Sequence, residues 1–150
     1  MYLKISKWLE IIAFKARQKS LYFELKHYIK NNETYFRRVH YWERGMGKTY
    51  TLVKLANKFK CPIAVQSEMS AIYIKRMCRD LKIKNIIIIP CNNSIKGKRF
   101  ERILCEEGID VEFINEVLKS MCKYLIGYNN VDIYSNKNNF QQEYECKWIG

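Results

Sequence analysis

The chain has 150 residues, 48% of them apolar and 14% aromatic, and this composition excludes an intrinsically disordered protein in favour of one folded domain. Its net charge of +12 indicates a polyanionic partner such as nucleic acid, a nucleotide or an acidic protein surface, unless the lysines merely solvate the surface. The six cysteines form no C-x-x-C pair, and neither of the two histidines lies near a cysteine pair, which excludes a zinc site of ordinary spacing.

The cysteines and the N-terminus both indicate a soluble cytoplasmic protein. The cysteines lie far apart and mostly beside apolar neighbours, and no signal peptide points to an oxidising compartment, so we expect reduced, mostly buried thiols. The apolar run at residues 11–14 is too short, and too closely flanked by charge, to form a secretory signal or to span a membrane. We therefore expect no membrane partner.

Residues 1–34 are predicted to form a helical extension ahead of the main domain, which we place at residues 35–150. Apolar side chains recur in the extension at helical spacing, and again after Ser20, which predicts two amphipathic helices or one bent helix. These positions are Ile5, Trp8, Leu9, Ile12 and Ala16, followed by Leu21, Leu25, Tyr28 and Ile29. The opposite faces are basic, which suits a membrane surface, a nucleic-acid contact or simply the solvated side of a packed extension.

The segment that constrains function most is the glycine-rich turn Glu43-Arg44-Gly45-Met46-Gly47-Lys48-Thr49. A predicted strand at residues 36–42 leads into it, and apolar residues at helical spacing over residues 52–59 follow it. This order is typical of a phosphate-binding loop, because glycines let backbone amides point inward and a helix N-terminus adds positive potential. The full pattern G-x-x-x-x-G-K-[ST] has a glycine where this chain has Trp42, so an ordinary turn or a decayed loop is the alternative.

The phosphate-loop hypothesis gives each of these residues a role. We expect Lys48 to reach the β- and γ-phosphates of ATP or GTP, and the Thr49 hydroxyl to hold Mg²⁺. The nucleotide is expected to contact Gly45, Met46, Gly47, Lys48, Thr49 and Tyr50.

The middle of the chain alternates strands with helices. Residues 63–65, after Cys61-Pro62, predict a short buried strand, and a helix follows. One side of that helix is predicted to carry Ser70, Ile74, Met77, Cys78 and Leu81. The four isoleucines at 86–89 predict a strand buried on both faces of a parallel sheet, and residues 91–98 a loop at its end, where ligands gather in such sheets. The alternation predicts an α/β fold.

A second chemical group is the acidic pair Glu106-Glu107, which follows the apolar run Ile103-Leu104-Cys105. Glu106 lies 57 residues beyond Thr49, at a place where a second loop can reach the same edge of the sheet. We expect Glu106 to hold Mg²⁺ together with Thr49, and Glu107 to orient the attacking water as a catalytic residue beside Lys48. The alternative is a solvated acidic turn that ends a strand.

The last part of the chain is predicted to contain a helix and two strands. Asp110 is a good N-cap, and Gly127 is the expected helix stop. The apolar positions between them are Ile114, Val117, Leu118, Met121, Cys122 and Leu125. Residues 131–134 predict the next strand, after which Asn136 either senses the γ-phosphate or only forms a turn. Alternation over residues 143–148 predicts a final antiparallel edge strand.

The motif at residues 44–49, the Cys-Pro strand and the run at residues 103–108 before an Asp-capped helix resemble small P-loop proteins encoded by bacteriophages, of the AAA-like ATPase type. The resemblance covers about residues 36–136. It implies a three-layer αβα nucleotide-binding core of the class with an extra catalytic glutamate. This chain departs from the family at Trp42, at Glu106 in place of an aspartate, and in having no C-terminal lid domain.

Two functions follow as expectations. The first is an ATP- or GTP-binding P-loop protein with slow, Mg²⁺-dependent hydrolysis. The second is a non-enzymatic phage anti-defence inhibitor, or nucleic-acid-binding protein, whose basic surface acts on nucleic acid or on a nucleic-acid-handling complex in the host cytoplasm. The intact Gly-Lys-Thr favours the first, whereas the imperfect motifs and the +12 charge favour the second. The sequence leaves the oligomeric state open.

Overall fold

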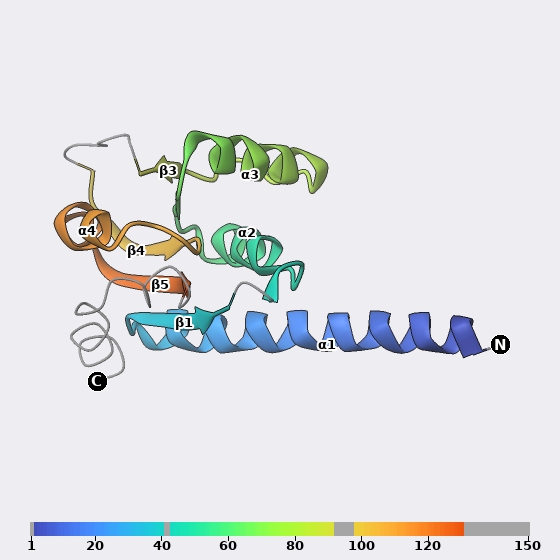
Figure 1. The fold of residues 1–150 in the computed structure, drawn as a ribbon. Coiled ribbons are helices and arrows are strands. Elements are labelled where there is room, and N and C mark those ends of the chain that lie inside the picture. Colours follow the sequence, from blue (N-terminus) through green and yellow to red (C-terminus); the bar gives the residue numbers. More distant parts are fainter. Residues whose placement is uncertain (1, 41–42, 92–97, 131–150) are drawn as a thin grey trace.

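The computed structural model describes residues 2–40, 43–91 and 98–130, and its elements confirm an α/β fold (Figure 1). In chain order they are α1 (Tyr2–Asn31), β1 (Tyr35–Val39), α2 (Lys48–Phe59), β2 (Ile63–Val65), α3 (Glu68–Asp80), β3 (Ile88–Pro90), β4 (Phe100–Cys105), α4 (Val111–Phe113), the π-helical turn η2 (Ile114–Leu118), α5 (Lys119–Met121) and β5 (Cys122–Asn130). The turn and helix predicted after residue 43 are present, as are the strands predicted at residues 63–65 and 103–105.

The five strands form one sheet in the order β1-β5-β4-β2-β3, and every pair of neighbours is parallel. The carboxyl ends of parallel strands share one edge of the sheet, so the turn after β1 and the acidic pair after β4 lie at the same edge. Only β5 separates the two strands. The topology therefore brings the two predicted motifs near each other.

Helices cover both faces of the sheet. Helices α1, α2 and α3 pack on one face, and the segment α4-η2-α5 packs on the other (Figure 1). The first core includes Leu21, Leu25, Leu52, Leu55, Ile74 and Leu104. The second includes Phe36, Ile89, Ile103, Ile109, Leu118 and Leu125. Each such side chain contributes about 1.5–3 kcal/mol by leaving water, so the two cores hold the sheet edge in place.

Helix α1 is one continuous helix that runs straight in Figure 1, so the two helices or one bent helix predicted for the N-terminal region are not what forms. Its C-terminal half buries Leu21, Leu25 and Ile29 in the core shared with α2. Its N-terminal half projects beyond the rest of the molecule (Figure 1) and leaves large apolar side chains in solvent, including Trp8 at 62% exposure. Only the second half of α1 is therefore fixed by packing.

The isoleucine strand differs from its prediction. Strand β3 begins only at Ile88 and lies at the edge of the sheet, paired with β2 alone. Ile89 is fully buried, whereas Ile87 is 41% exposed. A run of isoleucines suits a central strand and an edge strand equally well. Strand order places β3 at the edge, and the run does not encode that order.

The prediction that the last helix extends to Gly127 is also wrong. Asp110 caps it as expected, because its Oδ1 accepts a 2.8 Å hydrogen bond from the Glu112 amide. The helical segment ends at Met121, however, and Cys122–Asn130 forms the strand β5 between β1 and β4. The strand predicted at 131–134, Asn136 and the edge strand at 143–148 lie outside the described residues.

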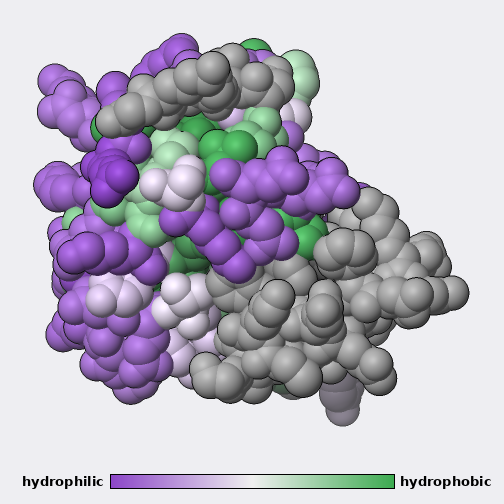
Figure 2. All heavy atoms as spheres, turned by 90° about the vertical axis from the view of Figure 1, so that its left-hand side faces the viewer, coloured by the Kyte–Doolittle hydropathy of each residue, from purple (hydrophilic) through white to green (hydrophobic). Residues whose placement is uncertain are grey.

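Hydrophilic side chains cover much of the surface at the end of the molecule where α4 lies, around a smaller apolar area (Figure 2). Lys48 is the only charged residue that is buried in the described part of the chain. None of the helices in that part is long and apolar enough to cross a membrane.

Candidate functional site

The turn between β1 and α2 has the backbone shape that its glycines allow. Gly45 and Gly47 both have φ of +75°, a left-handed conformation that other residues adopt only at a cost. Gly47 is the N-cap of α2, and its carbonyl accepts a 2.9 Å hydrogen bond from the Thr51 amide. Helix α2 therefore starts at the sheet edge with Lys48, and the first amides of a helix have no hydrogen-bond acceptor within the helix itself.

Lys48 is held at the centre of this site. Its side chain is buried, and Nζ donates a 2.7 Å hydrogen bond to the backbone oxygen of Glu43. The same Nζ lies 3.5 Å from Oε1 of Glu107, the second residue of the acidic pair. A buried ammonium needs such partners, since an unpaired buried charge is strongly unfavourable. The structure therefore brings together Lys48 and Glu107, which the sequence predicts to belong to one catalytic site but not to contact each other.

Glu43 and its neighbours fix the shape of the turn. The Glu43 Oε2 accepts a 2.8 Å hydrogen bond from the His40 amide, and Oε1 lies 3.6 Å from Nη2 of Arg37. Arg37 in turn donates through Nε to Glu24 of α1 at 3.2 Å. Sequence reasoning missed this chain of contacts, because the links of Arg37 to Glu43 and to Glu24 of α1 follow no local pattern.

The two glutamates of the acidic pair have different surroundings. Glu107 faces Lys48, whereas the Glu106 carboxylate accepts a 3.2 Å hydrogen bond from the Gln66 amide at the end of β2. Burial raises the pKa of Glu106 above its ordinary value, the Gln66 and Ser70 hydrogen bonds offset part of this, and the charge of Glu107 raises it further. Glu107 is thus the acid beside Lys48, whereas burial makes the charged form of Glu106 unfavourable.

Replacing Glu106 with glutamine is expected to stabilise the ligand-free protein at neutral pH. Because the folded state raises the carboxyl pKa, its stabilising contribution is full at low pH and is lost as the pH rises through the folded pKa. Glutamine has no such loss and keeps an acceptor for the Gln66 amide. Thermal unfolding at pH 7 should show a higher Tm for Glu106→Gln, with a difference that shrinks toward pH 4.5. A variant with an unchanged or lower Tm at pH 7 would contradict this.

Strand β5 adds residues that were not expected in the site. The Tyr128 hydroxyl lies 3.4 Å from the Lys48 carbonyl oxygen, and its burial raises the Tyr128 pKa. Asn129, at the carboxyl end of the strand, has a buried Oδ1 that accepts no hydrogen bond from the described residues. The polar residue considered as a γ-phosphate sensor in the sequence was instead Asn136, which lies outside the described residues. The two asparagines that end the apolar run of β5 were the available signal.

Helix α1 lies against the glycine-rich turn. A Cβ added to Gly47 would come within 2.2 Å of Nε2 of Gln18, so the Gln18 side chain packs directly on this glycine. Tyr50 and Thr51, in the first turn of α2, face the same helix across a groove. Of the other residues expected to contact a nucleotide, Met46 packs against the core, and Thr49 is partly buried at the start of α2.

A metal site made wholly of protein side chains is not part of this arrangement, since no group of three or more His, Cys, Asp or Glu side chains suited to a metal occurs among the described residues. Mg²⁺ does not require one, because it keeps several waters and usually binds one or two protein oxygens together with substrate phosphates. In comparisons with known proteins, no family model, curated protein or solved structure matches this chain.

Proposed function

We propose that this protein binds a nucleoside triphosphate, ATP or GTP, at the turn between β1 and α2. The observation that carries the proposal is the buried Lys48, which lies at the first position of α2 and 3.5 Å from Glu107. Two left-handed glycines precede it, a backbone shape that lets the amides at a helix N-terminus turn toward an anion. A lysine, a helix N-terminus and a nearby acid are the parts that phosphate binding and transfer require.

Binding a phosphate would exchange one partner of Lys48 for another. In the structure the ammonium forms an ion pair with Glu107 and donates a hydrogen bond to the Glu43 carbonyl oxygen. A γ-phosphate offers Lys48 stronger charge-assisted hydrogen bonds than a single carboxylate at 3.5 Å. Glu107 then becomes free to accept a proton from, or orient, a water molecule beside the γ-phosphate. The ion pair thus satisfies the Lys48 charge before phosphate binds, and its separation on binding supplies both the lysine and the glutamate that hydrolysis needs.

Mg²⁺ fits the site through few protein ligands. The Thr49 hydroxyl, in the first turn of α2, and Glu106, through water, are the residues that would hold it. The ion would neutralise charge that develops on the phosphate oxygens during hydrolysis.

The direct test is the affinity of the purified protein for ATP and for GTP, measured by calorimetry with Mg²⁺ and with EDTA. We expect saturable binding that is tighter with Mg²⁺, and slow release of inorganic phosphate. The Glu107→Gln variant should bind with similar affinity but lose turnover by about 10²–10⁴-fold, because the amide accepts hydrogen bonds but does not act as a base. Absence of binding by the unaltered protein would overturn the proposal, and unchanged turnover would remove Glu107 from it.

A further inference from the structure

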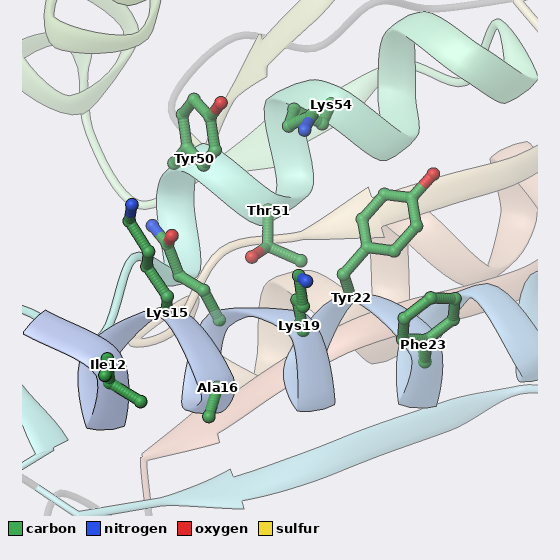
Figure 3. Close-up of a pocket in the computed structure, with 10 residues that line it drawn as sticks. Ile12, Lys15, Ala16, Lys19, Tyr22, Phe23, Tyr50, Thr51 and Lys54 are labelled. Atoms are coloured by element: carbon green, nitrogen blue, oxygen red, sulfur yellow. The ribbon is translucent and has the colours of Figure 1, made fainter.

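A second candidate site lies between α1 and α2, beside the glycine-rich turn. It is an open groove of about 580 Å³. Figure 3 shows Lys15, Lys19 and Tyr22 of α1 pointing toward α2. The residues that define its chemistry are Lys15, Lys19, Tyr22 and Phe23 of α1, and Tyr50 and Lys54 of α2.

The groove combines positive charge with aromatic rings. The Lys54 Nζ lies 5.8 Å from the centre of the Tyr22 ring and 5.3 Å from that of Tyr50, so one ammonium contacts both rings. Phe23 is 59% exposed, and it meets Tyr22 edge to face at a ring separation of 5.6 Å. The Lys26 Nζ also lies over the Tyr22 and Phe23 rings, at 5.7 Å and 5.5 Å from their centres, so a planar ligand would take the place of an ammonium on these rings.

Several lysines lie on or beside this groove. No acid lines the groove in the part of the chain that the structure describes. Just beyond it, the charge of Lys58 is the main cause that lowers the pKa of Lys26, and Lys30 lowers it further. Close like charges repel one another, and a polyanion laid along the groove would relieve this repulsion.

A second basic groove, beside α3, provides an internal comparison. It is lined by Lys75, Arg79, Lys82 and Lys84 and has a similar volume of about 640 Å³. Its other described lining residues are Cys78, Ile83, Asn85, Ile86 and Ile88, so it has the charge but no aromatic ring. The two grooves differ in the feature that stacking requires.

We infer that the groove between α1 and α2 binds single-stranded nucleic acid. Bases stack on Phe23, Tyr22 and Tyr50, while Lys15, Lys19 and Lys54 contact phosphates. Unpaired bases offer their faces to aromatic side chains, whereas a duplex keeps them stacked inside, so this groove discriminates against double strands. The inference rests on the groove alone and does not require that the neighbouring turn bind a nucleotide.

The test is fluorescence anisotropy of the full chain with a labelled oligo(dT) of about 12 nucleotides, within the site size of one small domain, in the absence of nucleotide. The groove variant is K15E/K19E/K54E, and the matched control is K75E/R76E/R79E on α3, which changes the net charge equally. We expect the control to bind as the unaltered protein does at moderate salt. The groove variant should lose binding, and the slope of log affinity against log salt should fall in magnitude by about 2, at about 0.7 per phosphate contact.

A single substitution separates stacking from charge and does not depend on the folding of the triple variant. Phe23→Ala removes an exposed ring, and we expect it to weaken oligo(dT) binding by at least about fivefold, since stacking on one ring is worth about that much or more. A duplex of equal length should bind more weakly than oligo(dT). The inference is overturned if oligo(dT) does not bind at low salt, if both triple variants lose binding equally, or if Phe23→Ala has no effect.

Discussion

The Lys48→Ala variant is expected to lose nucleotide binding by about 100-fold or more while it keeps its fold. Removing one partner of a buried charged contact typically costs about 2–5 kcal/mol, which corresponds to a factor of about 30 to several thousand in affinity. Alanine is the best helix former, and position 48 is the first residue of α2, so the helix itself should persist. Calorimetric titration with ATP and Mg²⁺ measures the loss, and circular dichroism checks the fold.

The matched control for this variant is Lys75→Ala in α3. It removes the same charge from an exposed helical position, far along the chain from the glycine-rich turn. If general positive charge attracts the nucleotide, both variants should weaken binding alike. Equal nucleotide affinity in Lys48→Ala and the unaltered protein would exclude a phosphate site at this turn.

The Gly127→Ala variant is expected to destabilise the fold by about 2–4 kcal/mol, more than an ordinary surface substitution. A Cβ at this position would lie 2.1 Å from the backbone oxygen of Cys105, its partner in the β4-β5 ladder. The clashing atom belongs to the backbone of a central strand, so it cannot rotate away as the end of a side chain could. The two strands would have to separate locally, at a cost in hydrogen bonds and core packing. Urea unfolding of the two proteins measures the difference.

Gly45→Ala separates this steric effect from backbone strain. No atom lies within 4 Å of the Cβ it would add, but its φ of +75° costs a residue with a Cβ about 1–2 kcal/mol. We expect Gly45→Ala to be the milder of the two variants. A smaller loss of stability for Gly127→Ala than for Gly45→Ala would show that β4 and β5 do not approach as closely as described.

Local patterns predicted the elements whose signals are complete within a few residues. The glycines of the turn, the apolar period of α2 and the Asp110 cap each depend on near neighbours, and each is present in the structure. The helix that was expected to reach Gly127 shows the limit of such signals. Cys122 and Leu125 suit a helical face and a strand equally well, and pairing of β5 with both β1 and β4 decides in favour of the strand.

Some residues of the candidate site were predictable from the sequence and others were not. Lys48 and Glu107 were predictable as partners, because a strand-end turn and a strand-end acidic pair meet wherever parallel strands share an edge. The contributions of Gln18, Glu24 and Asn129 were not. The first two depend on how α1 docks, and the third on where β5 ends, and both are set by packing over long sequence separations.

The contact between Gln18 and Gly47 lies where the two proposed sites meet. The same helix that supplies one wall of the aromatic groove rests on the glycine that caps α2, so a ligand that shifts α1 also alters the turn. Thermodynamic linkage then requires reciprocity: whatever factor a strand in the groove applies to the affinity for a nucleotide, the nucleotide applies to the affinity for the strand. The sign of that factor depends on whether the occupied turn holds Gln18 in place or displaces it. The Gln18 side chain would then couple the binding of the two ligands.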